Sequence, residues 1–159
     1  MAAFKSSLPP IPPKGRVLGL DVGVKRVGAA VSDSAQGTAL SKAIWPREWK
    51  QLKNLIVGAQ AVGVVLGEPK HMSGEAGERA QSVTDLAKLI EAELQLPVAL
   101  MDERLTSVQA QNAFFEQREA GSRQTRASSR DAAQSLDASA AVLLLQAWLD
   151  VRRNESLDA

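Results

Sequence analysis

The stretch Val17-Leu18-Gly19-Leu20-Asp21-Val22-Gly23-Val24-Lys25-Arg26-Val27-Gly28-Ala29-Ala30-Val31-Ser32 decides the fold. Residues 17–22 and 26–32 are two short runs of β-branched and aliphatic residues, and a tight turn that contains glycine joins them. This pattern is typical of two strands that form a hairpin. A third strand is predicted over about residues 38–44, before Pro46. The chain is therefore expected to begin with an antiparallel unit.

The pattern after this unit alternates between helix and strand. From Trp49 the apolar residues recur at helical spacing, which predicts a helix there, a second helix over about residues 76–94 and a last one over about residues 131–151. Apolar runs at residues 62–66 and 97–101 predict two buried strands, and Thr106 with Gln109 forms a capping box for a further helix. The order predicts an α/β fold with a mixed five-stranded sheet and helices on both faces. Right-handed crossovers would place the later strands beside the first one.

The composition narrows the class of protein. The chain has 159 residues, 19 Lys and Arg against 18 Asp and Glu, 45% apolar residues, one His and no Cys. This indicates one globular domain, expected over residues 15–151, with a flexible Pro-rich leader over residues 1–14 and a tail over residues 152–159. The lack of cysteine excludes disulfides, thiolate zinc sites and cysteine nucleophiles, and it suits a cytoplasmic location. No apolar run reaches the length of about 18 residues that a membrane span needs.

Acidic residues adjoin apolar segments at three distant places. Asp21 lies inside an apolar strand, where a charge is costly unless a cation or a donor compensates it. Asp102 and Glu103 follow the strand at 97–101, and residues at such strand ends point into the ligand crevice of open sheets. Asp137 shares a helix face with Ala141 and other small or apolar residues. Hydrogen bonding in a turn, solvation in a loop and the dipole at a helix start are the structural alternatives for these acids.

Three inward carboxylates repel one another unless a positive charge lies between them. Divalent metal ions supply that charge, and ligation by carboxylates alone selects hard ions such as Mg²⁺ or Mn²⁺. Two such ions about 4 Å apart activate a water and stabilise the leaving oxygen in phosphodiester cleavage. The acids therefore suggest a two-metal site.

Four blocks of the sequence, in order, resemble the YqgF/RuvX family, the bacterial Holliday junction resolvase-like proteins that are also described as nucleases for the 16S ribosomal RNA precursor. The blocks are the hairpin at 19–33, Gly67-Glu68-Pro69-Lys70 through Gly74, Asp102-Glu103-Arg104-Leu105-Thr106-Ser107 and Leu136-Asp137-Ala138-Ser139-Ala140-Ala141. The resemblance covers about residues 15–151. It implies a ribonuclease H-like (RNase H-like) fold and a metal-dependent endonuclease whose catalytic and metal-binding acids are Asp21, Glu103 and Asp137.

Two positions depart from the family pattern. The family usually has an apolar residue where Glu68 stands, and a Thr or a similar small polar residue is common where Val24 stands. Glu68 is expected to be either a fourth metal ligand or a solvated loop charge. Val24 lacks a hydroxyl with which the hairpin turn could contact phosphate.

Basic residues lie near these acids and in a loop expected over residues 121–130, which is rich in Gly, Ser and Arg and contains no acid. Such residues neutralise phosphates and supply most of the sequence-independent affinity for nucleic acid, although each one alone is equally consistent with ordinary surface charge. The candidates are Lys25, Arg26, Lys70, Arg104, Arg123, Arg126 and Arg130. With 4% aromatic residues, recognition is expected through backbone and shape rather than base stacking.

Three functions are compatible with these features. The first is the endonuclease, acting on structured RNA or on branched DNA. The second is a nucleotide-binding protein of the actin and sugar-kinase type, although those proteins clamp nucleotide between two such domains. The third is a non-catalytic nucleic-acid-binding module. A monomer and a homodimer both remain open, because symmetrical cutting of a two-fold junction would require a dimer.

Overall fold

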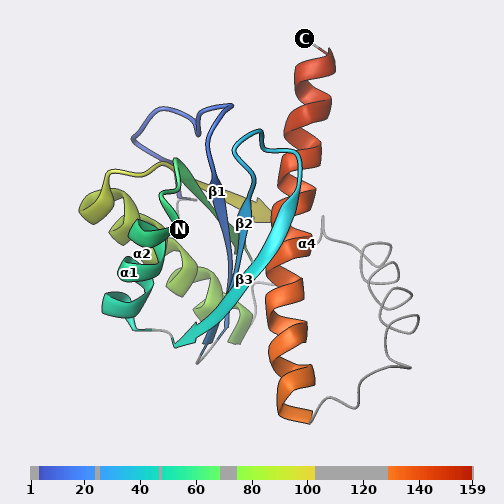
Figure 1. Cartoon of the computed structure of the whole chain (residues 1–159). Helices are drawn as coiled ribbons and strands as arrows, with labels where there is room; N and C mark the ends of the chain where they lie inside the picture. The colour runs from blue at the N-terminus through green and yellow to red at the C-terminus, as the bar shows by residue number, and fades with distance from the viewer. Residues whose placement is uncertain (1–3, 24–25, 47, 69–74, 103–128, 159) are drawn as a thin grey trace, which may run out of the picture.

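Five strands form one mixed sheet in the order β3-β2-β1-β4-β5, in a computed structural model that describes residues 4–23, 26–46, 48–68, 75–102 and 129–158 (Figure 1). The strands are β1 (Val17–Val22), β2 (Arg26–Ser32), β3 (Ala39–Pro46), β4 (Gly63–Glu68) and β5 (Val98–Asp102). The helices are α1 (Trp49–Ala59), α2 (Glu75–Leu94) and α4 (Ser129–Asp158). Strand β2 pairs antiparallel with β1 and β3, whereas β4 pairs parallel with β1 and β5. The predicted fold class is confirmed.

The core consists of two layers, because side chains alternate between the faces of the sheet. One layer packs against α1 and α2 and includes Leu18, Leu20 and Val22 of β1. The other layer packs against α4 and includes Val17 of β1. Figure 1 shows α1 and α2 on one side of the sheet and α4 on the other. Strand β1 is therefore buried on both sides, which explains its nearly continuous apolar sequence.

The predicted ends of most elements agree with the structure to within about two residues, but the last helix is longer than expected. Helix α4 begins at Ser129 and continues to Asp158. Arg130 therefore belongs to this helix and not to the predicted basic loop, and residues 152–158 are helical where a tail was expected. No glycine or proline follows Val151 to end the helix. The capping-box helix predicted from Thr106 lies outside the described residues.

The Pro-rich leader contacts the domain at a few points, although most of residues 4–14 are exposed. Ile11 is 5% exposed and packs in the layer beneath α4. Prolines lack the amide donor but keep the carbonyl acceptor. The Gln36 side chain donates to the Pro12 carbonyl at 2.7 Å, and the Arg152 guanidinium donates to the Ile11 carbonyl. These two donors fix a segment that cannot pair as a strand.

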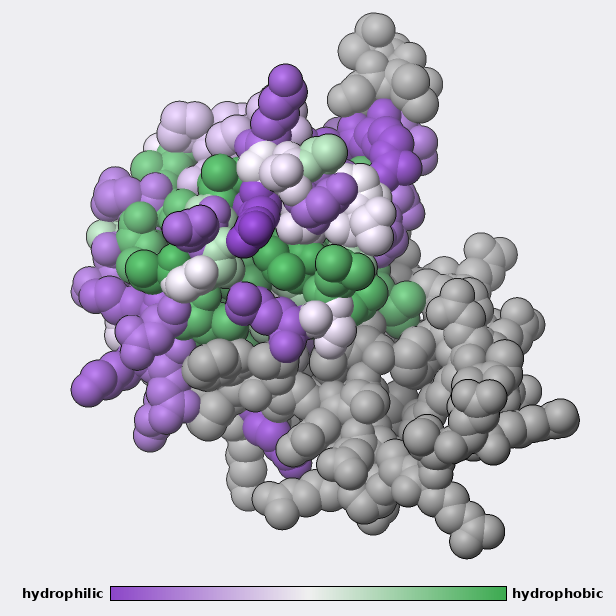
Figure 2. All heavy atoms as spheres, in the orientation of Figure 1, coloured by the Kyte–Doolittle hydropathy of each residue, from purple (hydrophilic) through white to green (hydrophobic). Residues whose placement is uncertain are grey.

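The surface in Figure 2 carries apolar residues across the middle of the face that β3 crosses, with hydrophilic residues around them. Strand β3 is an edge strand, and its Leu40 side chain is 59% exposed. Within the described ranges, no helix has the length and apolar character that crossing a bilayer requires.

The first prediction concerns Glu91 on α2, which accepts hydrogen bonds from the leader. This side chain is 7% exposed and accepts hydrogen bonds from the Ser6 hydroxyl, the Ser7 amide and the Val98 amide. Glu91→Ala leaves the buried Val98 amide without this acceptor, so the free energy of unfolding in urea is expected to fall by about 1–3 kcal/mol. Glu91→Gln keeps an acceptor oxygen and should lose less. Equal stability of Glu91→Ala and wild type would contradict this role.

A second prediction concerns the turn between β2 and β3. An Asp33 carboxylate oxygen accepts from the Gly37 amide at 2.8 Å and from the Thr38 amide at 3.2 Å, and these bonds lower the pKa of Asp33 below its ordinary value of 3.8. A lowered folded-state pKa contributes stability above the unfolded pKa, and that contribution is lost as the pH falls through the folded pKa. Melting temperatures measured between about pH 7 and pH 2 should therefore decline less steeply at the acid end for Asp33→Asn. If the melting temperatures of wild type and Asp33→Asn fall equally steeply with pH, the Asp33 carboxylate does not contribute to stability in this way.

Candidate active site

Asp21 lies near the end of β1, beside glycines in both adjacent strands. It is half-buried, and the alternation along β1 places it on the same face as Val17, the face that α4 covers. In β2 its register partner is Gly28. In β4 the next position after the Leu20–Leu66 pair is Gly67. Glycine inside a strand often marks the close approach of a ligand or of another backbone. Neither neighbouring position therefore carries a side chain beside this carboxylate.

Helix α4 runs antiparallel to β1 across this face. Near the start of β1, Arg152 donates to the Gln36 side chain at 3.2 Å, and Gln36 donates to the Gly15 carbonyl at 3.0 Å. Farther along β1, Gly19 lies against Leu145, because a Cβ built on Gly19 would come 2.8 Å from the Leu145 Cβ. Residue numbers therefore rise along β1 in the direction in which they fall along α4.

This geometry brings helix position 137 level with Asp21. From Gly19, Asp21 lies two strand residues farther along, or about 7 Å. From Ala141, whose carbonyl oxygen is 3.5 Å from the same built Cβ, position 137 lies one helical turn back, or about 6 Å in the same direction. Ala141 is fully buried, and its small side chain fits the close approach of the helix to the sheet. The side chain of Asp137 lies outside the part of the structure that is described.

Glu68 and Asp102 lie opposite each other in the register of β4 and β5. Alternation places Glu68 with Leu66, and Asp102 with Val98, on the face that packs against α1 and α2. The alternation along β4 therefore places Glu68 on the other face of the sheet from Asp21. Among the described residues, no three His, Cys, Asp or Glu side chains form a group that could hold a metal ion.

Most of the other candidates lie in segments that are not described. Glu103, Lys25, Lys70, Arg104, Arg123 and Arg126 are outside the described residues. For Arg130 the structure gives the backbone, in the first turn of α4, but not the side chain.

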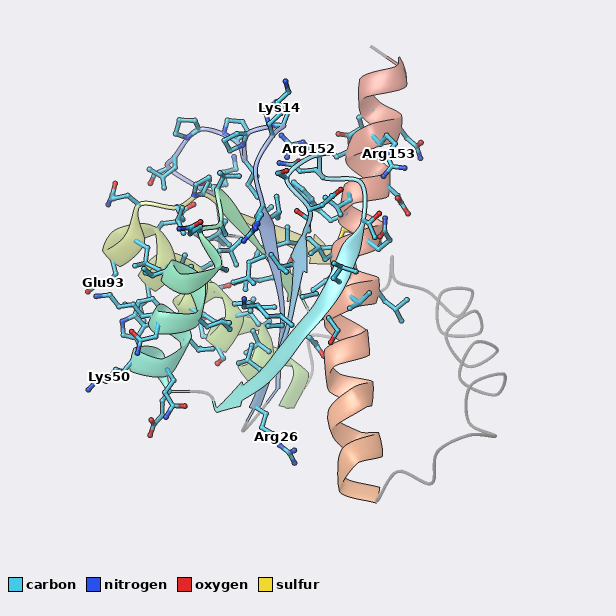
Figure 3. The ribbon with its side chains drawn as sticks, viewed as in Figure 1. Lys14, Arg26, Lys50, Glu93, Arg152 and Arg153 are labelled. Carbon is cyan, nitrogen blue, oxygen red and sulfur yellow. The ribbon has the colours of Figure 1, made fainter. Side chains whose placement is uncertain are left out.

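Arg26 is the predicted phosphate-binding residue whose side chain the structure places. It is exposed at the start of β2, and alternation puts it on the same face as Ala30, beneath α4. It is two residues from Gly28, the register partner of Asp21. Figure 3 shows Arg26 at the end of the sheet opposite to Arg152 and Arg153. The Gly23 amide, donating to the Arg26 carbonyl at 2.8 Å, fixes the hairpin here.

Two residues that hold α4 against the sheet are not evident as such from the sequence. Gln36 has a left-handed backbone with φ of 61° and is 8% exposed, yet it looks like an ordinary loop residue in the sequence. Gly19 could have been found, because it alternates with Asp21 on one face of a strand that is otherwise apolar. A glycine at that position signals close packing.

The mixed sheet with its parallel centre, the half-buried aspartate on β1 and the long C-terminal helix define a ribonuclease H-like domain. Thermus thermophilus RuvC, solved in complex with Holliday junction substrate, has the same fold: the match has a TM-score of 0.56 and 12% identity, and it covers 87% of this chain and 96% of that one. The chain belongs to the RuvX family, whose family model, described as "RuvX: Holliday junction resolvase", matches residues 15–151.

Curated relatives agree with this assignment. Proteins named "Putative pre-16S rRNA nuclease" are similar over nearly the whole chain. The one from Desulfitobacterium hafniense is 37% identical over 145 residues, covering 89% of this chain and 96% of its own length. The one from Mycobacterium ulcerans is 42% identical over 146 residues, covering 88% of this chain and 81% of its own length. The predicted family resemblance is confirmed.

Proposed function

We propose that this protein is a metal-dependent endonuclease that hydrolyses phosphodiester bonds in structured nucleic acid. The observation that carries the proposal is the position of Asp21, half-buried beneath α4, level with helix position 137 and flanked by Gly28 and Gly67. A half-buried carboxylate beside the apolar residues of this face is a suitable ligand for a cation. The family membership and the names of the curated relatives support the same class of activity.

Asp21, Glu103 and Asp137 would hold the metal. Alternation along β5 puts Ala99 and Met101 on the α4 face, and a continuation by one residue would put Glu103 there as well. Three carboxylates are a donor set that suits Mg²⁺ or Mn²⁺, and the glycines beside Asp21 leave room for ions that keep some of their water. When bound, one or two such ions would lower the pKa of a water and stabilise the leaving oxygen.

The remaining work of the site is to bind and orient the phosphate backbone. Arg26 lies on the face of Asp21 at the end of the sheet and would hold a phosphate next to the carboxylates. Lys25, Lys70 and Arg104 would contact flanking phosphates, and Arg123, Arg126 and Arg130 would reach over the bound strand. These contacts read backbone and shape, not bases.

The substrate is structured RNA, a branched DNA junction or both. The curated relatives are named for an RNA precursor, whereas the family model is described by the junction. The purified protein, supplied with a precursor 16S rRNA end and with a four-way DNA junction, in Mg²⁺ and then in Mn²⁺, separates these substrates. Binding without cleavage of either substrate would favour the non-catalytic module. The cytoplasmic location and the choice between monomer and homodimer stay predictions.

Asp21→Asn tests the role of the central carboxylate. The substitution keeps the size of the side chain and removes its charge, so we expect cleavage to fall by roughly 100-fold or more, the scale on which losing one group of a reaction centre acts. Stability should change little or rise, because a charge that repels its neighbours is removed. The measurements are single-turnover cleavage and thermal unfolding of both proteins.

Glu68→Gln is the matched control. It removes one carboxylate from the neighbouring strand end, on the other face of the sheet, and should cleave at nearly the wild-type rate. An Asp21→Asn variant that cuts as fast as wild type would make Asp21 structural. A Glu68→Gln variant that loses activity as Asp21→Asn does would restore Glu68 as a ligand.

The three arginines Arg123, Arg126 and Arg130 supply a prediction about binding. Each phosphate neutralised on duplex DNA contributes roughly 0.9 to the slope of log K against log salt. Replacing all three by Ala should weaken binding uniformly across sequences and reduce that slope by up to about 3. Metal affinity should not change. Equal slopes for the two proteins would mean that these arginines are ordinary surface charge.

A further inference from the structure

We propose that a bulge at Lys42 keeps the free edge of β3 from pairing with a second copy of this chain. The inference is independent of the proposed function, because it concerns the outer edge of the sheet and not the site around Asp21. The surface in question is the edge of a strand, and the partner that fits it is another β-strand.

The bulge consists of one extra residue in β3. Ser41 opposes Ala30 of β2 and Ala43 opposes Ala29, so the register passes over Lys42 between two consecutive residues of β2. On either side of Lys42 the register is regular. The alignment of β3 with β2 therefore does not require this residue, and a strand without it would keep all its other pairs.

Strand β3 has the features of an edge that invites pairing. It is the outermost strand on one side of the sheet, and an unpaired edge of this kind is a template for another strand. Its eight residues, Ala39–Pro46, include one charged residue, which is Lys42. Leu40 is exposed, and Figure 2 shows further apolar residues across this face. A regular, uncharged strand of this composition would be prone to self-association.

Both ends of this edge are closed by other means. At the start of β3, the Ala39 amide donates to the Gln146 side chain of α4 at 3.0 Å, so this amide points away from β2. The strand finishes at Pro46, which has no amide to donate. The middle of the edge is left, and there Lys42 is exposed. A bulge bends a strand away from a straight partner, and two copies of Lys42 would repel each other across a new pair of strands.

The test is sedimentation equilibrium of the full chain, which measures the dissociation constant for self-association. Deletion of Lys42 removes the bulge and the charge together, and we expect it to lower this constant by about 10-fold or more. Lys42→Thr removes the charge alone and should have a smaller effect in the same direction. Lys42→Glu keeps a charge at the bulge and should behave as wild type. Lys50→Ala is the matched control, because it removes the same charge from an exposed position on α1, and it should also behave as wild type.

A proline on the same edge shows whether the new contact is made there. Alternate residues of a strand point their amides to the same side, so the Ser41 amide faces the free edge as the Ala39 amide does. Ser41→Pro removes this donor without taking a hydrogen bond from β2. Combined with the deletion of Lys42, it should return the dissociation constant to that of wild type.

Lys42→Thr keeps the proposal testable if the deletion variant does not fold. The proposal is overturned if the folded variants without the Lys42 charge associate no more than wild type, or if Lys50→Ala associates as strongly as they do. It is also overturned if Ser41→Pro does not reverse the association. Unchanged association of Lys42→Thr, together with a smaller salt dependence of its binding to nucleic acid, would make Lys42 a phosphate contact instead.

Discussion

The packing of α4 across β1 is the contact on which the rest of the structure depends. Its buried residues form the second core layer, and Gly19 allows the helix backbone to come close to the strand. The same helix ties down two outlying segments. Gln146 accepts from the Ala39 amide at 3.0 Å at the start of the edge strand β3, and Arg152 donates to the Ile11 carbonyl of the leader. Helix α4 therefore takes part in the core packing, holds the edge strand β3 and contributes to the geometry of the candidate site.

This arrangement bears on how the fold keeps the Asp21 carboxylate near the end of its central strand. Asp21 stands in a strand whose neighbours on both faces are apolar, and such a group costs stability unless it is compensated. A charged side chain in an apolar strand is unfavourable by itself, and the packing of the surrounding residues keeps it in place. The leader and the Gln36 network lie at the opposite end of the sheet, whereas α4 continues across this face to the level of Asp21.

The strands and most helices can be predicted from the sequence because each follows from the residue pattern within its own segment. Both apolar runs of the hairpin and the turn between them lie within residues 17–32. The structure has strands over the two predicted ranges. Contacts between distant residues could not be predicted. Ile11 packs on Gly63, and the composition of the leader pointed to a flexible arm. The face on which Glu68 lies follows from strand register, which the strand end alone does not reveal. Asp21 is placed as predicted on the sheet, whereas Glu103 and the side chain of Asp137 remain predictions.

A crystal of the protein grown with Mn²⁺ tests the central claim most directly, through the anomalous scattering of the metal. We expect one or two anomalous peaks between β1 and α4, within coordination distance of the Asp21 carboxylate and of oxygens from Glu103 and Asp137. Peaks at Glu68 and Asp102 on the other face of the sheet, or an Asp21 carboxylate that contacts no metal at saturating Mn²⁺, would contradict it.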